Sequence, residues 1–197
     1  MAGARAEQIT GLVLAGGRGE RLGGVDKGWI LYRGRPLIES VVERFAPQVG
    51  SLLISANRNL QRYAALAEVV TDADSGVPTD AYPGPLAGVL AALNAARTEW
   101  MAFVPCDAPH LPADLVERLA GAVGAADAAC AQVDGRLQPV FALVRRATSA
   151  SLQRHFTAGG RAMHAWLSSL AAVAVDFDDA AAFRNINTAE DAEGRAA

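Results

Sequence analysis

Residues 9–17 read Ile-Thr-Gly-Leu-Val-Leu-Ala-Gly-Gly. The first seven of these residues form a short, almost uninterrupted apolar run, and two glycines end it. A run of this length without polar alternation is typical of a strand that is buried on both faces. Such strands occur in parallel sheets that helices cover on both sides, so this stretch predicts an α/β protein.

Further short strands follow, and helical segments separate them. Residues 51–56, 68–71 and 100–105 predict these strands. Helices are predicted where apolar residues recur three or four positions apart, in four segments: from Pro36, over 59–66, from Pro85 and from Pro112. This alternation predicts an open, mostly parallel sheet with helices on both faces.

The pattern changes after residue 123. Residues 128–133 and 137–145 flank an Asp134-Gly135 turn, which predicts either a hairpin or an antiparallel insertion. The remaining predicted elements follow in order: a helical segment over 148–170 broken at Gly159-Gly160, a strand over 172–177, and a short helix capped by Thr188. A length of 197 residues predicts one domain, over residues 1–197.

The composition excludes several classes of protein. Hydrophobic residues make up 51% and charged residues 20%, which is typical of a globular protein and excludes a disordered chain. The net charge of −3 provides no overall positive field for nucleic-acid phosphates, so we expect no nucleic-acid partner. No apolar run reaches the roughly 18–20 residues that span a bilayer, and residues 1–15 do not resemble a secretory signal. We therefore expect no membrane association and a cytoplasmic location.

The glycine-rich segment 14–28 is the richest in chemistry. Glycines let backbone N–H groups approach an anion closely, and Arg18, Arg21 and Lys27 add three cations. After a strand, this combination indicates a polyphosphate cradle, and the alternative is a flexible surface loop. The spacing fits neither a P-loop, which needs Gly-Lys-Ser/Thr, nor the Gly-x-Gly-x-x-Gly dinucleotide fingerprint.

Two aspartates directly follow predicted strands. Asp107 comes after residues 100–105, where a carboxylate can hold Mg²⁺ beside phosphate oxygens, and Asp72 follows residues 68–71. The alternative for both is a solvated turn, or helix capping before Pro112. Because ligands of open α/β sheets bind beyond the carboxyl ends of the strands, we expect residues 16–28, 72–88 and 106–112 to converge on one cleft.

Taken together, these motifs resemble the molybdenum cofactor guanylyltransferase (MobA) family. The resemblance covers residues 9–191 and rests on five matches: Leu-Ala-Gly-Gly at 14–17, Gly-Gly-Val-Asp-Lys-Gly at 23–28, Tyr-Pro-Gly-Pro-Leu-Ala-Gly at 82–88, Cys-Asp-x-Pro at 106–109 and Phe-x-Asn-Ile-Asn-Thr at 183–188. It implies a Rossmann-like three-layer nucleotidyltransferase fold with a mostly parallel sheet. It also implies transfer of GMP from GTP to molybdenum-molybdopterin, with Mg²⁺, giving the guanine dinucleotide cofactor and pyrophosphate.

The resemblance also implies the roles of particular residues. It assigns nucleotide contacts to Leu14, Ala15, Gly16, Gly17, Lys27, Ser55, Asp72 and Asp107. Asp107 would bind the metal, and Asp107, Lys27 and Arg21 would be catalytic. Ser55 stands where the family usually has Asn, so this contact loses the amide. Asn57 is expected to face the other way, and the role is not moved to it.

The resemblance further implies a nucleotide half over about residues 9–110 and an acceptor half over about 111–191. The expected partners are GTP and molybdopterin, together with molybdoenzymes or other cofactor-biosynthesis proteins, and we expect a monomer. Two alternatives stay open. One is a related nucleotidyltransferase that uses CTP or a sugar phosphate, and the other is a non-catalytic GTP-binding protein that delivers the cofactor.

Overall fold

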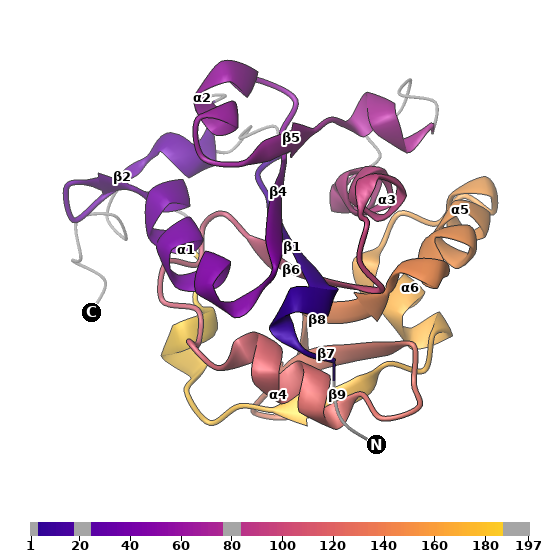
Figure 1. Cartoon of the computed structure of the whole chain (residues 1–197). Helices are drawn as coiled ribbons and strands as arrows, with labels where there is room; N and C mark the ends of the chain where they lie inside the picture. Colours follow the sequence, from indigo (N-terminus) through magenta and orange to yellow (C-terminus); the bar gives the residue numbers. More distant parts are fainter. Residues whose placement is uncertain (1–3, 18–24, 77–83, 187–197) are drawn as a thin grey trace.

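The computed structural model describes residues 4–17, 25–76 and 84–186 (Figure 1). Its centre is a seven-stranded sheet with the order β5-β4-β1-β6-β8-β7-β9. The strands are β1 (Ile9–Leu14), β4 (Ser51–Ser55), β5 (Glu68–Val70), β6 (Trp100–Pro105), β7 (Ala128–Val133), β8 (Arg136–Arg145) and β9 (Val173–Asp176). Within the described residues, β8 alone runs against the other strands of this sheet, so the sheet is mostly parallel, as expected.

Helices cover both faces of this sheet. They are α1 (Leu37–Phe45), α2 (Leu60–Ala64), α3 (Pro85–Ala95), α4 (Leu115–Ala122), α5 (Ser149–Thr157) and α6 (Met163–Ser169). In Figure 1, α3, α5 and α6 lie on one side of the strands, and α1 and α4 lie on the other. This arrangement confirms the predicted three-layer α/β fold.

The apolar run of β1 is continuous because its two faces enter different cores. Ile9 and Val13 pack in the cluster that contains side chains of α1 and α4. Leu12 points the opposite way, into the cluster that contains side chains of α3, α5 and α6. Ile9, Leu12 and Val13 are all at most 1% exposed. Burial on both faces therefore explains why the strand shows no polar alternation.

The hairpin predicted around Asp134-Gly135 is confirmed, and it is also an insertion into the sheet. Asp134 and Gly135 both have positive φ, 49° and 72°, as a tight turn between strands requires. β8 pairs antiparallel with β7 on one side and with β6 on the other. It thus joins the first part of the sheet to the last two strands.

One short hairpin was not predicted. β2 (Leu31–Tyr32) pairs antiparallel with β3 (Arg35–Pro36) across Arg33 and Gly34, which both have positive φ. Pro36, the expected start of a helix, ends β3, and α1 begins one residue later at Leu37. The expected helix cap at Thr188 lies outside the described residues.

Helix α3 lies directly against the end of β4. A methyl group on Gly88 would overlap the hydroxyl of Ser55, which is itself only 2% exposed. This close approach needs glycine on the helix because any larger side chain forces the two elements apart. Within the described residues, no helix is both long enough and apolar enough to cross a membrane.

We expect Gly88→Ala to destabilise the chain, because overpacking a well-packed core costs about 1–3 kcal/mol. For a chain of this size, that is a fall of roughly 2–10 °C in melting temperature. Gly121 on α4 is the matched control, because it is exposed and a methyl group there meets no atom within 4 Å. Gly121→Ala should be neutral or stabilising by up to about 1 kcal/mol, since alanine favours a helix. Equal melting temperatures of the two variants would contradict the packing argument.

Candidate functional site

A cavity of about 240 Å³ opens at the carboxyl ends of β1, β4 and β6. From β1 the chain continues to β4 and β5 on one side, and it then returns to β6 on the other side. Such a reversal of strand order is where open α/β sheets bind their ligands. The cavity is lined by Leu14, Ala15, Gly16, Gly17, Lys27, Ser55, Asp72, Gly84, Pro85, Pro105, Cys106, Asp107, Val140 and Asn185.

All eight residues to which the family resemblance assigned nucleotide contacts line this cavity, whereas the expected catalytic residue Arg21 lies outside the described residues. Backbone pairing continues past the strand ends and brings the first of these residues together. The Ala15 N–H donates to the Ser55 carbonyl at 2.8 Å, and the Cys106 N–H donates to the Leu14 carbonyl at 3.1 Å. The end of β1 is therefore fixed between β4 and β6 at the floor of the cavity.

Lys27 and Asp107 form an ion pair at this floor. The Lys27 Nζ lies 3.2 Å from Asp107 Oδ2, although the two residues are far apart in the sequence. Of the 18 lysine and arginine residues in the chain, Lys27 is the one lysine. The arrangement places a single ammonium group, with three rotatable donors, where an anion would enter.

The Asp107 carboxylate is buried and only partly paired. Its side chain is 8% exposed, and its Oδ1 atom is buried without a hydrogen-bond partner. Burial raises the pKa of Asp107, although the charge and hydrogen bond of Lys27 act in the opposite direction. Helix capping is excluded as its role, because α4 begins at Leu115 and is preceded by Asp114. The donor set at Asp107 thus has an oxygen available for a second cation.

Asp72 is held at the cavity by Asn57. The Asp72 N–H donates to Asn57 Oδ1 at 2.9 Å, and burial raises the pKa of the Asp72 carboxyl. A methyl group on Gly16 would lie 3.1 Å from Asn57 Nδ2, 3.6 Å from Ser55 Oγ and 3.9 Å from Asp72 Oδ1. The side chains of Asn57, Ser55 and Asp72 therefore all lie close to Gly16, and the absence of a side chain at Gly16 leaves room for them.

The expectation that Asn57 faces away from the site was wrong. Alternate residues of a strand share a face, so a strand that continued would already place Asn57 on the side of Ser55. β4 in fact ends at Ser55, and Asn57 turns its amide toward Asp72 and Gly16. Asn57 does not itself line the cavity, but it contacts Asp72 and Gly16, which do, and this supporting role was missed from the sequence.

Two further lining residues come from the second part of the chain. The register between β7 and β8 shifts, because Cys130 pairs with Ala142 whereas Gln132 pairs with Leu137. Val140 lies in the extra residues of β8 at this irregularity, and a bulge of this kind can direct a side chain into a site. Asn185 belongs to the Phe-x-Asn motif, to which no role was given. Its neighbour Ile186 donates its N–H to the Asp107 carbonyl at 2.8 Å.

The chemistry of the cavity suits an anionic substrate rather than a covalent nucleophile. Burial raises the pKa of the Cys106 thiol well above its ordinary value, so the thiol stays protonated. Among the described residues, no three His, Cys, Asp or Glu side chains come together in a group that could hold a metal ion. A metal here would need Asp107 together with oxygens of the substrate, which is how Mg²⁺ is commonly bound beside phosphates.

Comparison with known proteins places this geometry in a family. The sequence profile described as the MobA-like NTP transferase domain matches residues 11–173. A molybdenum cofactor guanylyltransferase of Cupriavidus metallidurans is 47% identical, and the match covers 94% of this chain and 93% of that protein. A protein of the same name from Cupriavidus pinatubonensis is also 47% identical, over 94% of each chain.

A solved structure gives the same answer. The crystal structure of molybdopterin-guanine dinucleotide biosynthesis protein A from Archaeoglobus fulgidus superimposes with a TM-score of 0.70 at 26% identity. The match covers 93% of this chain and 94% of that one. Sequence, fold and the position of the cavity therefore agree, and the chain belongs to the MobA-like NTP transferase family.

Proposed function

We propose that this chain transfers GMP from GTP to molybdenum-molybdopterin, forming the guanine dinucleotide cofactor and releasing pyrophosphate. The observation that carries this proposal is the cavity, around which the eight expected nucleotide-contacting residues lie together. The names of the relatives that match almost the whole chain support the same reaction. The chain is accordingly a nucleotidyltransferase, acting in molybdenum cofactor biosynthesis.

The reaction needs positioning and charge neutralisation more than a covalent intermediate. A phosphate oxygen of the pterin attacks the α-phosphorus of GTP, and the bond between this phosphorus and the bridging oxygen to the β-phosphate breaks. Pyrophosphate leaves with the electron pair of that bond. The attacking phosphate is already an anion, so no general base has to activate it. The chain must therefore hold two anions close together and in line.

Residues of the cavity have properties that suit these tasks. The Leu14 carbonyl and the Ala15 N–H are used within the sheet, so the backbone of Gly16 and Gly17 would offer N–H and C=O groups to the nucleotide, and these glycines allow it to approach closely. Lys27 would donate to the phosphates as negative charge shifts toward the leaving pyrophosphate. Asp72 would accept hydrogen bonds from the sugar or the base. Arg21 stays a proposed catalytic residue from the family pattern alone.

The residues at Asp107 fit a bound Mg²⁺ ion. The buried, unpartnered Oδ1 atom and the raised pKa of this carboxyl both favour a second positive charge beside it. A bound Mg²⁺ would supply Lewis-acid neutralisation of the phosphate oxygens. Lys27 would keep the other carboxylate oxygen oriented, since it already lies 3.2 Å from Oδ2.

The remaining expectations belong to the same proposal. The nucleotide half would span about residues 9–110, and the acceptor half, over about 111–191, would include Val140 and Asn185, which line the cavity. We propose a monomer in the cytoplasm that hands its product to molybdoenzymes or to other cofactor-biosynthesis proteins.

One experiment tests the function directly. The protein is incubated with Mg²⁺, metal-loaded molybdopterin and each nucleoside triphosphate in turn, and the products are identified by mass. The guanine dinucleotide cofactor together with pyrophosphate is the expected result. A cytosine dinucleotide or a nucleotide sugar would assign the chain to another transferase class, and GTP binding without pyrophosphate release would indicate a delivery protein.

Asp107→Asn should leave the fold intact and lower turnover by roughly 100-fold or more, because the transition state loses charge stabilisation at the phosphates. Asp114→Asn is the matched control, since this aspartate is exposed and lies in the turn before α4. Turnover at saturating Mg²⁺ and melting temperature are measured for both. Near-normal turnover of Asp107→Asn would exclude the metal-binding role.

Lys27→Ala should weaken the use of GTP more than it lowers stability. The side chain lines the cavity, where a charged hydrogen bond to phosphate is worth about 1.5–3 kcal/mol. Both kcat/KM for GTP and the melting temperature are measured. A large fall in melting temperature with unchanged kcat/KM would show that the Lys27–Asp107 pair is structural.

GTP should be preferred over CTP and ATP, although Ser55 stands where the family has Asn. Backbone groups at the end of β1 outnumber the single lost amide, and polar groups left unpaired by a wrong base cost about 1–3 kcal/mol, or roughly 10- to 100-fold in kcat/KM. Ser55→Asn should be neutral or mildly lower KM for GTP. The kcat/KM values for the three nucleotides check this, and equal use of CTP by the unmodified chain would contradict it.

A further inference from the structure

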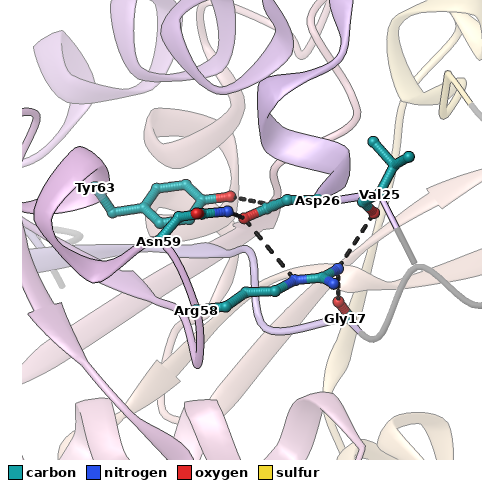
Figure 2. A network of polar contacts seen from close by, with 6 residues as sticks. All are labelled: Gly17, Val25, Asp26, Arg58, Asn59 and Tyr63. Atoms are coloured by element: carbon teal, nitrogen blue, oxygen red, sulfur yellow. Dashed lines mark hydrogen bonds and ion pairs between the residues drawn. The ribbon is translucent and has the colours of Figure 1, made fainter.

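A second buried carboxylate, Asp26, lies just before Lys27 and does not line the cavity. It is 7% exposed, and both of its oxygens are paired. Tyr63 donates its hydroxyl to Oδ1 at 2.5 Å, and Asn59 donates its amide to Oδ2 at 2.8 Å. The Arg58 Nε lies 3.9 Å from the same Oδ2 (Figure 2). We call Asp26, Arg58, Asn59 and Tyr63 the clamp.

Arg58 connects this carboxylate to two separate points of the backbone. Its Nη2 donates to the Gly17 carbonyl at 2.9 Å and to the Val25 carbonyl at 3.2 Å. Gly17 and Val25 are the described residues on either side of positions 18–24. Figure 2 shows one guanidinium group reaching both carbonyls and Asp26. The same side chain therefore holds the backbone at Gly17, just after β1, and at Val25, two residues before Lys27.

The backbone after Asp26 is also held in place, by a hydrogen bond and by ring contacts of Trp29. Lys27 begins the short helical turn η3 (Lys27–Trp29), in which the Trp29 N–H donates to the Asp26 carbonyl at 3.1 Å. The Trp29 ring packs 5.1 Å from the Tyr63 ring, centroid to centroid, and the Arg62 guanidinium lies 3.7 Å over the Trp29 ring. The chain is thus fixed immediately before and immediately after Lys27.

Gly28 provides a second sign that the clamp needs this geometry. A methyl group on Gly28 would lie 2.5 Å from the Tyr63 hydroxyl, the same hydroxyl that donates to Asp26. The residue directly after Lys27 must therefore be glycine-sized, because a side chain there would displace the Tyr63 hydroxyl from Asp26. Burial raises the pKa of Tyr63, which keeps this hydroxyl protonated and able to donate.

We propose that Asp26 and Arg58 are positioning residues of the transfer reaction, which act by fixing where Lys27 directs its ammonium group. This inference rests on the phosphate-binding role proposed above for Lys27. A flexible lysine stem loses much of its value at a transition state unless its backbone is held, because small displacements of a binding group cost large factors in rate. The Arg58 side chain is 34% exposed and its Nε lies 3.9 Å from Asp26, and a partly exposed ion pair of this kind adds little stability, so stability alone does not account for the clamp.

The competing explanation is that the clamp only stabilises the fold. A structural role would lower activity by the same factor whether or not Lys27 is present. A positioning role acts through Lys27, so its effect should disappear once Lys27 is removed. A double-mutant cycle of Arg58→Ala and Lys27→Ala separates the two explanations.

The cycle is measured as kcat and KM for GTP in the transfer reaction. Arg58→Ala alone should lower kcat/KM for GTP by roughly 10- to 100-fold, as expected for a misplaced binding group. In the Lys27→Ala background the same change should cost less than about threefold, because the two losses are not additive. Equal losses in both backgrounds overturn the inference.

The same cycle also tests the foundation of the inference. If Lys27→Ala alone leaves the GTP kinetics unchanged, the role proposed for Lys27 fails and the inference fails with it. That outcome is distinct from equal losses in the two backgrounds, where Lys27 keeps its role and only the positioning by Arg58 is rejected.

A spectroscopic measurement reports the position of Lys27 directly. Because the chain has one lysine, labelling with ¹⁵N-lysine gives a single backbone amide signal, from Lys27. In the unmodified chain this signal should shift when GTP and Mg²⁺ are added. In Arg58→Ala the Lys27 amide should have a different chemical shift before ligand is added, and the change in chemical shift caused by GTP and Mg²⁺ should be smaller. An unchanged signal and response would overturn the inference.

Two further variants control for folding. Arg118→Ala is the matched control, because Arg118 also donates to a backbone carbonyl, that of Asp176 on β9, three strands from β6. It should leave the kinetics and the Lys27 signal unchanged. Tyr63→Phe keeps the ring and removes only the hydroxyl, so it carries the same cycle if Arg58→Ala does not fold. Its loss should be smaller than that of Arg58→Ala and should also vanish without Lys27. Equal losses for Tyr63→Phe with and without Lys27 would reject positioning by the clamp.

Discussion

The pairing of β1 with a parallel strand on each side is the constraint on which the rest of the structure depends. β4 pairs with it over Thr10–Leu14, and β6 pairs with it over Ile9–Leu14. Apolar clusters then cover both faces of β1, so neither face of the strand can carry an exposed polar side chain. The carboxyl end of β1 opens onto the cavity, and the glycines begin there. The site is a consequence of how the centre of the sheet is buried.

Two buried carboxylates beside that strand end illustrate different solutions to the same electrostatic problem. Asp26 has partners for both of its oxygens, so its negative charge is fully accommodated by the protein. Asp107 has Lys27 on one oxygen and a buried oxygen without a partner. A satisfied carboxylate orders its surroundings, whereas an incompletely satisfied one favours a further cation. Asp26 is therefore suited to hold the backbone around the site in place, and Asp107 is suited to bind a cation within it.

Much of this could be predicted from sequence, and the misses have physical causes. The buried strands and the turn at Asp134-Gly135 could be predicted because their signals are local. The hairpin of β2 and β3 was missed because strands of two residues have no periodicity to detect. The side on which Asn57 lies could have been predicted, because residues two apart in a strand share a face and Ser55 lines the cavity. The link between Asp26 and Arg58 could not, because it joins residues with no fixed spacing in the chain. Contacts of this kind arise only when distant loops meet at one edge of the sheet.

The reversed strand β8 has a consequence for the order in which the chain assembles. Within the described sheet, β7 and β9 reach the other strands only through β8, which pairs with β6 over residues 142–145. β7 and β8 are adjacent in sequence, and their tight turn lets them form early and locally, since short loops close quickly. Docking of this hairpin on β6 then requires contacts across a long stretch of chain. The edge of β6 stays open to other strands until that step, which exposes it to mispairing during synthesis.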